Sequence, residues 1–352
     1  MQYPFAEKYD ASDYIILNSN INPFGTSPLA LKAISENLSK INMYPSREEH
    51  EKVKNQIVTK MKREYINVNE KQIVLGNGSD EVIEFFIKFG IRKFKRPKVI
   101  VGDKTFAFYE YCARSYGLDV IKVPLKNFGY DTEKIIETAK KNSPCLIMIC
   151  NPINPTGKII PKKELEDFIN EIPQDSFLLS DEAYFEFAFY LNCKDWRGDD
   201  YRSALQLNIK RPVFISRTFS KAYGLAGLRL GYLICDFSDE IERHISPPFN
   251  VNYLAIKAGE KAILDIDFLQ KTVENNYNGL RILESIEGAI PSWANFVLIK
   301  VKKKDIYNEL KNNRILVRNM EQYGFEGFIR VSVGKIEEIE IFQKIFRKIL
   351  NQ

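Results

Sequence analysis

The residues best suited to anion binding and catalysis lie in short polar segments, each of which follows an apolar run. Thr218, Ser220 and Lys221 follow the apolar run 213–216, and Arg229 comes soon after them. Two hydroxyls and a guanidinium suit a phosphate monoester. The segment 78–80 (GSD) opens an expected helix, whose first backbone N–H groups favour a second phosphate contact. Together these segments predict a site for a phosphorylated small molecule.

Two more segments of this kind add a carboxylate, an amide and a phenol. Asp181 and Tyr184 follow the apolar run 177–179, and Asn154 lies in the segment 151–157 (NPINPTG), after the apolar run 145–150. Taken alone, Asp181 could be a helix cap, 151–157 a rigid turn and Lys221 a solvated surface charge. Together the side chains match the needs of pyridoxal phosphate, which uses a lysine for a Schiff base and a carboxylate beside its pyridine nitrogen.

The elements that position these residues follow an alternating pattern. Between about residues 70 and 235, strand-like runs alternate with helical patterns, which predicts an α/β domain with a mostly parallel sheet. In the first such helix, Ser79 is expected as the N-cap and Gly90 as the end. Ligands of parallel sheets bind at the carboxyl ends of the strands, where the polar segments lie. The expected strands are 72–75, 98–101, 120–123, 145–150, 177–179, 213–216 and 228–235.

After residue 246 the pattern changes to helices mixed with fewer strands, which indicates a smaller α+β domain. The segment before Pro28 lacks periodicity and is expected to pack as an arm on that small domain. We therefore predict an N-terminal arm (1–27), a large cofactor-binding domain (28–246) and a small C-terminal domain (247–352).

Composition excludes several classes of protein. The 352 residues are 45% hydrophobic and 28% charged, which is typical of a globular protein. The net charge of +5 is too small to indicate nucleic-acid binding, and no apolar run is long enough for a membrane span. Residues 1–10 lack a secretory signal, and the five cysteines form no CxxC pair, which favours a cytoplasmic location. With only two histidines, neither a metal site nor a Ser-His-Asp triad is expected.

Longer motifs run along nearly the whole chain. They include 17–25 (LNSNINPFG), 44–45 (YP), 76–81 (GNGSDE), 154–157 (NPTG), 181–187 (DEAYFEF), 217–231 (RTFSKAYGLAGLRLG), 249–252 (FNVN), 294–296 (ANF), 317–318 (VR) and 329–334 (IRVSVG). On these motifs the chain resembles the fold type I pyridoxal-phosphate aminotransferases and is most similar to histidinol-phosphate aminotransferases. The resemblance implies the fold type I architecture.

The resemblance also implies a role for each matching residue around the cofactor. Lys221 would form the Schiff base and carry the proton, Asp181 would pair with the pyridine nitrogen, and Asn154 and Tyr184 would hold the ring oxygen. Tyr109 would stack on the ring, with Phe106 as the second choice. The cofactor phosphate would be held by Thr218, Ser220, Arg229 and the backbone of Gly78, Ser79 and Asp80.

Further residues would bind the substrate or the neighbouring subunit. Arg330 would grip the carboxylate or phosphate of the substrate, Arg318 would be a second anion contact, and Asn20 would line the pocket. Tyr44 would reach the cofactor phosphate of the partner in a homodimer with shared active sites.

The implied activity is a ping-pong aminotransferase reaction. Glutamate and 2-oxoglutarate would exchange an amino group with a phosphorylated three-carbon ketone or amino alcohol. The pair would be imidazole acetol phosphate and histidinol phosphate, or a ring-free analogue such as dihydroxyacetone phosphate and serinol phosphate.

One motif departs from this family, because Ile21 stands in 20–23 (NINP) where histidinol-phosphate aminotransferases commonly have glutamate. The form with isoleucine resembles threonine-phosphate decarboxylases, so decarboxylation of a phospho-amino acid is the alternative. A dinucleotide oxidoreductase is disfavoured, because Glu81 occupies the third glycine position of G-x-G-x-x-G. A catalytically silent regulator is disfavoured by the intact Lys221 and Asp181.

Overall fold

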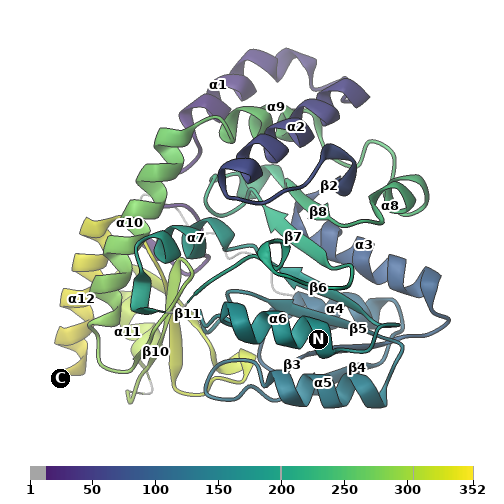
Figure 1. The fold of residues 1–352 in the computed structure, drawn as a ribbon. Helices are drawn as coiled ribbons and strands as arrows, with labels where there is room; N and C mark the ends of the chain where they lie inside the picture. Colours follow the sequence, from purple (N-terminus) through teal and green to yellow (C-terminus); the bar gives the residue numbers. More distant parts are fainter. Residues whose placement is uncertain (1–12, 199, 304, 352) are drawn as a thin grey trace.

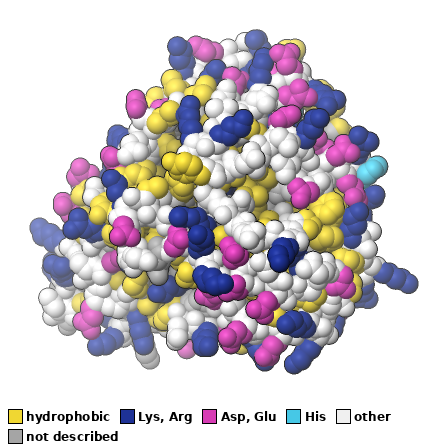
Figure 2. Space-filling view, in the orientation of Figure 1, with side chains coloured by type: hydrophobic (Ala, Val, Ile, Leu, Met, Phe, Trp, Pro, Cys, Tyr) yellow, Lys and Arg dark blue, Asp and Glu magenta, His cyan; other side chains and the backbone are white. Residues whose placement is uncertain are grey.

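The computed structural model describes residues 13–198, 200–303 and 305–351, which form two β-sheets and the helices around them (Figure 1). The expectation about a signal in residues 1–10 lies outside this described part. Among the described helices, none is long and apolar enough to cross a membrane. On the face drawn in Figure 2, basic and acidic side chains are interspersed with hydrophobic ones.

The larger sheet confirms the predicted α/β fold. Its seven strands have the order β2-β8-β7-β6-β5-β3-β4, and all are parallel except β8, which is antiparallel to both neighbours. The interior strand β5 is buried along its whole length, as its continuous apolar sequence predicts. The strands are β2 (Ile73–Gly76), β3 (Lys98–Gly102), β4 (Val120–Val123), β5 (Cys145–Cys150), β6 (Phe177–Asp181), β7 (Phe214–Thr218) and β8 (Gly231–Ile234).

Helices cover both faces of this sheet, as right-handed crossovers between parallel strands require (Figure 1). One face carries α3 (Gly78–Lys93) and α4 (Phe108–Ser115), and the other carries α5 (Thr132–Lys141) and α6 (Lys162–Glu171). The helix α7 (Phe185–Cys193) follows β6 and packs on α10 (Ile266–Glu284).

Both predicted ends of α3 are wrong. Asn77, not Ser79, is the N-cap, and the helix continues past Gly90 to Lys93. Gly90 is needed instead for close packing, because a Cβ atom there would lie 2.4 Å from Leu146 Cδ1 of β5. The glycine therefore lets α3 approach the sheet. In the sequence alone, a glycine needed for packing looks the same as a glycine that ends a helix.

The smaller sheet has the strand order β1-β11-β12-β10-β9. Its first strand, β1 (Ile15–Leu17), comes from the N-terminal segment and pairs in parallel with β11 (Ile315–Asn319). The helices α10 and α12 (Ile336–Leu350) pack together beside this sheet (Figure 1). The other elements here are β9 (Ala289–Ile290), β10 (Phe296–Lys300), α11 (Ile306–Asn312) and β12 (Phe328–Ser332). The domain boundaries proposed from the sequence stay a prediction.

Of the remaining helices, α1, α2 and α9 lie at the top of Figure 1 and α8 lies at the upper right. There α9 (Tyr253–Ala262) packs against α1 (Pro28–Asn37) and α2 (Arg47–Arg63), while α8 (Ser238–His244) lies near β2. Short 3-10 helices complete the chain: η1 (Leu38–Lys40), η2 (Glu70–Gln72), η3 (Trp196–Gly198), η4 (Ala204–Gln206), η5 (Ala226–Leu228) and η6 (Glu321–Tyr323).

A buried network of charges joins α2 and α7 to the carboxyl ends of β6 and β7. Arg217 of β7 binds the Glu182 carboxylate through Nη2 at 2.8 Å and Nε at 3.1 Å, and both side chains are almost fully buried. The ammonium of Lys60 contacts Glu64 at 2.9 Å and Glu186 at 2.8 Å. Since Glu182 follows Asp181 and Arg217 precedes Thr218, the network fixes the strand ends that carry the candidate site residues.

Replacing Arg217 with methionine is expected to lower the free energy of unfolding by about 3–5 kcal/mol, because Glu182 would be left charged and unpaired. Chemical denaturation measures this change. The control is Lys163→Ala in the exposed Lys163–Asp167 pair, which should cost under about 1 kcal/mol. An Arg217→Met protein as stable as the control would show that the buried pair contributes little.

Candidate active site

Three adjacent parallel strands bring the polar segments to one edge of the larger sheet. Asp181 is the last residue of β6, opposite Cys150 of β5 and Ser216 of β7. Thr218 ends β7, and the loop with Asn154 follows β5. The strand ends therefore place Asp181 between the Asn154 loop and the 218–221 segment, as the sequence predicts.

Asp181 is buried and held by two hydrogen-bond donors. The Tyr109 hydroxyl donates to Oδ2 at 2.8 Å, and the Ala183 amide donates to Oδ1 at 3.2 Å. Burial raises the pKa of Asp181 to about 6, while these two donors lower it. Asp181 is therefore ionised above that pH and can pair with a cationic group.

Lys221 lines the pocket beside this edge. Burial lowers the pKa of Lys221 to about 8, and the positive charge of Arg330 lowers it further; the negative charge of Asp80 opposes this. A substantial fraction of the amine is therefore uncharged near pH 8, the form that attacks a carbonyl carbon. Asp181 and Arg229 also act on this amine electrostatically, which indicates that the predicted residues converge.

The N-terminus of α3 and the segment after β7 form an anion-binding arrangement. Arg229 Nη2 contacts Asp80 Oδ2 at 2.7 Å, and Gly78 has a φ of +80° with its Cα facing this guanidinium. A Cβ atom on Gly78 would lie 2.6 Å from Arg229 Nη2, so glycine is required there. The Thr218 hydroxyl donates to Ser220 Oγ at 3.0 Å. Hydroxyls, a guanidinium and a helix N-terminus gathered in this way fit a phosphate monoester.

Arg229 does not lie in a strand, although the sequence predicts one over 228–235. The strand β8 begins at Gly231, and Arg229 has left-handed backbone angles after η5. This turn directs the guanidinium back toward the start of α3, where it contacts Asp80.

A pocket of about 210 Å³ opens beside Lys221 and is lined by six residues that were first choices for the site. They are Asn20, Asn154, Tyr184, Lys221, Arg318 and Arg330. The other lining residues are Ser19, Thr105, Phe106, Ala107, Pro155, Met320 and Tyr323. The pocket therefore combines residues of the larger sheet, the N-terminal segment and the smaller sheet.

Hydrogen bonds across this pocket orient the two groups expected at the cofactor's ring oxygen. Arg330 Nη1 donates to Asn154 Oδ1 at 2.6 Å, so the amide nitrogen of Asn154 is left as the donor. Asn20 Nδ2 donates to the Tyr184 hydroxyl at 3.0 Å. Burial raises the pKa of Tyr184 to about 12, so the phenol stays protonated and can donate. Both groups suit a ring oxygen that accepts hydrogen bonds.

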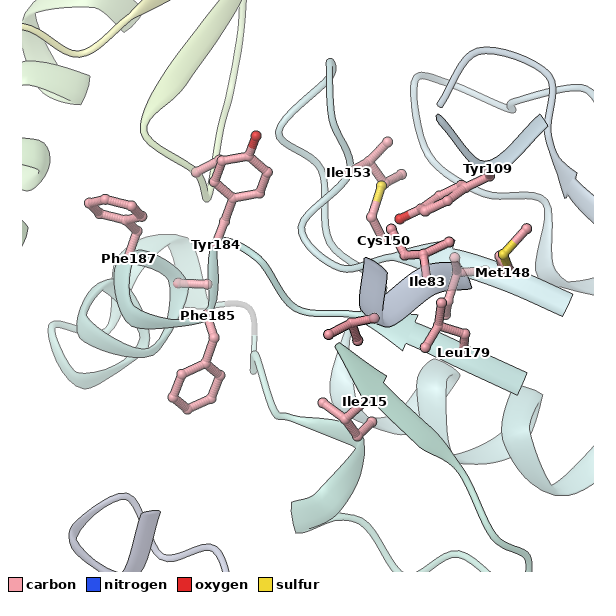
Figure 3. Close-up of a cluster of buried hydrophobic side chains, with 14 of the residues drawn as sticks. Ile83, Tyr109, Met148, Cys150, Ile153, Leu179, Tyr184, Phe185, Phe187 and Ile215 are labelled. Carbon is pink, nitrogen blue, oxygen red and sulfur yellow. The ribbon is translucent and has the colours of Figure 1, made fainter. Parts of the chain in front are cut away.

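The structure favours Phe106 over Tyr109 as the ring contact, which corrects the first choice made from the sequence. Phe106 lines the pocket, whereas Tyr109 is fully buried behind it, with the two rings edge to face at a centroid distance of 5.5 Å. In Figure 3 the Tyr109 ring lies beside Cys150 and Ile153, away from Tyr184. Tyr109 reaches Asp181 instead of the pocket.

Tyr44 and Ile21 are two of the positions discussed above that do not line this pocket. Tyr44 is 75% exposed and packs on Phe249, which is 58% exposed, with ring centroids 4.7 Å apart. Ile21 is partly exposed and is absent from the described pocket lining, although its neighbours Asn20 and Ser19 belong to it.

Sequence reasoning missed several lining residues. Thr105 and Ala107 lie just beyond the carboxyl end of β3, so the rule on strand ends could have identified them. Met320 and Tyr323 come from the η6 region after β11 of the smaller sheet. Nothing in their local sequence marks them, because the contact between the two sheets places them here.

Comparison with known sequences supports the resemblance. The family model for aminotransferase class I and II matches residues 12–345. A histidinol-phosphate aminotransferase of Desulfotalea psychrophila is 34% identical over 98% of this chain and 90% of its own length. Histidinol-phosphate aminotransferase 2 of Carboxydothermus hydrogenoformans is 36% identical over 90% of this chain and 86% of its own length.

Solved structures share the fold. A crystal structure from Erwinia carotovora atroseptica has a TM-score of 0.83 and 25% identity over 97% of both chains. The histidinol-phosphate aminotransferase of Sinorhizobium meliloti, in complex with pyridoxal-5'-phosphate, has a TM-score of 0.79 and 22% identity, covering 95% of this chain and 91% of its own. The L-threonine-O-3-phosphate decarboxylase of Porphyromonas gingivalis has a TM-score of 0.76 and 23% identity. The match covers 96% of this chain and 100% of the decarboxylase chain.

The family match spans most of the chain, and the full-length relatives exceed 30% identity. The fold type I architecture predicted from the motifs is confirmed. The chain belongs to the class I and II aminotransferases and is a pyridoxal-phosphate-dependent enzyme of that family.

Proposed function

We propose that this enzyme transfers an amino group between glutamate and a phosphorylated three-carbon ketone by a ping-pong mechanism. The observation that carries the proposal is the placement of Arg318 and Arg330 in the same pocket as Lys221. No acidic side chain is found in the described lining of that pocket, so it favours an anionic substrate. The curated relatives, which are histidinol-phosphate aminotransferases, support the phosphorylated substrate.

Lys221 is the proposed catalytic lysine. When bound, pyridoxal phosphate supplies an aldehyde that bonds to amines and a ring that accepts electrons. Lys221 would bond to that aldehyde and, once displaced by the substrate's amine, would move a proton to and from the substrate carbon. The pKa of about 8 for Lys221 suits both tasks near neutral pH.

The other residues would hold and orient the cofactor. Asp181 would keep the pyridine nitrogen protonated, while the amide nitrogen of Asn154 and the hydroxyl of Tyr184 would donate to the ring oxygen. Phe106 would contact the ring. The phosphate would be bound by Thr218, Ser220, Arg229 and the backbone of Gly78, Ser79 and Asp80, which form the anion-binding arrangement described above.

Replacing Lys221 with alanine should abolish the visible absorption of the lysine-bound cofactor and nearly all turnover. The cofactor should still bind through its phosphate, which equilibrium dialysis measures. Lys163→Ala, which changes an exposed lysine, is the control and should keep both properties. A Lys221→Ala enzyme with the absorption and activity of the wild type would exclude Lys221 as the catalytic residue.

We also propose a homodimer with shared active sites. Tyr44 and Phe249 form an exposed aromatic pair, and large apolar side chains near them, Leu38, Ile41 and Met43, are exposed as well. Exposed apolar side chains clustered in this way are typical of a surface that a partner covers. Tyr44 would then contact the cofactor phosphate of the second subunit.

Mixing Tyr44→Ala with Lys221→Ala subunits tests this sharing. Heterodimers should contain one intact site, so the mixture should regain up to about a quarter of wild-type activity after subunit exchange. Each variant alone, taken through the same exchange, is the control. Exchange without any regained activity would place the function of Tyr44 within its own chain.

The substrate's phosphate should contribute strongly to recognition. Histidinol phosphate should exceed histidinol in kcat/KM by about tenfold to a hundredfold or more, because a hydrogen bond to a charged group contributes about 1.5–3 kcal/mol. Arg330→Lys should reduce this preference, since lysine keeps the charge but loses the fork of donors. Equal kcat/KM values for the two compounds would refute the phosphate-binding role.

A separate comparison tests whether the preferred substrate carries an imidazole ring. Given the curated relatives, we expect histidinol phosphate to have a higher kcat/KM than serinol phosphate. The reverse preference would identify a ring-free substrate.

The second candidate function is decarboxylation of a phospho-amino acid. It is supported by the NINP motif at 20–23 and by the shared fold of the Porphyromonas gingivalis decarboxylase. Release of carbon dioxide from phosphothreonine, together with no reaction of either amino alcohol phosphate, would establish it. A cytoplasmic location is proposed on the cysteines, of which four are buried and all five are unpaired among the described residues.

A further inference from the structure

Tyr109 contacts Asp181 but has no role in the reaction proposed above. Its hydroxyl donates to Asp181 Oδ2 at 2.8 Å, and the tyrosine has no exposed surface. The Ala183 amide donates to the other oxygen at 3.2 Å. Two donors on opposite oxygens fix the plane of the carboxylate, and one lone pair of each oxygen remains for another partner.

The position of Tyr109 follows from the start of α4. Phe106 and Tyr109 are joined by a backbone hydrogen bond from the Tyr109 amide to the Phe106 carbonyl at 3.1 Å. Phe106 faces the pocket, and Tyr109 passes behind it to Asp181. A single turn of chain thus supplies both a lining residue of the pocket and a partner of the carboxylate.

Several charged or titratable groups act on Asp181 from the surrounding elements. Ser216 on β7 lowers the pKa of Asp181, and the negative charge of Asp80 on α3 raises it. Asp80 is itself paired with Arg229. The groups around Asp181 are Tyr109, Asp80, Ser216, Cys150, Tyr184 and Lys221.

Of the side chains that lower the basicity of Asp181, Tyr109 has the largest effect. Burial alone favours the neutral carboxyl, and the Tyr109 donor opposes burial more than any other group. Burial also raises the pKa of Tyr109 well above its usual value of 10.0, so the phenol remains a donor at every pH at which the enzyme is studied.

We propose that Tyr109 is a positioning residue that orients Asp181 and keeps it ionised, so that the proton between Asp181 and the cofactor's pyridine nitrogen stays on the nitrogen. The inference rests on the proposed role of Asp181. Without the phenol, Asp181 becomes a stronger base and takes a larger share of this proton. A less protonated ring accepts electrons less well, and the reaction slows.

The test compares Tyr109→Phe with Tyr130→Phe. Tyr130 is also buried, but its hydroxyl accepts a hydrogen bond from the Cys150 amide at 2.9 Å and makes none with Asp181. Asp181→Asn is the third variant. In the apoprotein, ¹³C NMR of labelled aspartate carboxyls follows the titration of Asp181, whose signal Asp181→Asn identifies by its absence. In the holoenzyme, ¹⁵N NMR of labelled pyridoxal phosphate reports whether the ring nitrogen is protonated.

Tyr109→Phe should raise the titration midpoint of Asp181 by about one to two pH units, since a hydrogen bond to a charged group is worth about one to two powers of ten in an equilibrium constant. The ¹⁵N signal at neutral pH should move toward the unprotonated position. The value of kcat should fall by about tenfold or more while KM changes far less. Tyr130→Phe should leave the midpoint and the ¹⁵N signal unchanged, whatever its effect on the melting temperature.

Different outcomes would overturn the role of Tyr109 and the role of Asp181. An unchanged Asp181 midpoint and ¹⁵N signal in Tyr109→Phe, with both altered or lost in Asp181→Asn, would overturn the role of Tyr109 alone. A holoenzyme with Asp181→Asn that keeps the wild-type ¹⁵N signal and rate would instead overturn the proposed role of Asp181. Equal shifts in Tyr109→Phe and Tyr130→Phe would show a general structural effect and would also refute the inference on Tyr109.

Discussion

Charged groups that leave water need a partner of opposite charge or a hydrogen-bond donor, and this requirement organises the edge of the larger sheet. Arg217 and Glu182 satisfy one another beneath the site, and Asp181 is satisfied by Tyr109 and the Ala183 amide. Asp80 and Arg229 pair at the start of α3. Because each pair joins different elements, the same contacts that stabilise buried charges also fix the positions of the strand ends.

The placement of Lys221 shows how this arrangement serves chemistry. Its amine lies within the electrostatic influence of two arginines and two aspartates, and burial lowers its pKa to about 8. An amine of this kind is a better nucleophile at neutral pH than a solvated lysine. Asp181 shifts in the opposite direction, to a pKa of about 6. Between these two values the carboxylate is charged and the amine is largely protonated but ready to lose its proton, as a site that transfers protons requires.

The two sheets contribute different parts of the site. Among the proposed cofactor contacts, Asp181 and Thr218 end strands of the larger sheet and Lys221 follows β7. Arg318 and Arg330 lie on β11 and β12 of the smaller sheet. The N-terminal segment connects them, since Asn20 contacts Tyr184 and Ser332. A change in the smaller sheet can therefore alter the pocket without altering the edge that carries Lys221.

The sequence by itself determined the alternation of strands and helices and the residues at the strand ends. The strands 120–123 and 145–150 have their predicted bounds. The second is a continuous apolar run buried along its whole length, which is visible in any window of the sequence. Asp181 and Thr218 follow from the same runs. Only the tertiary structure decided that Phe106 lines the pocket while Tyr109 binds Asp181. It also decided that Gly90 lies within α3 and packs against β5, and that Met320 and Tyr323 reach the site. These outcomes depend on the direction of side chains and on contacts between segments far apart in the chain, and neither is encoded in local periodicity.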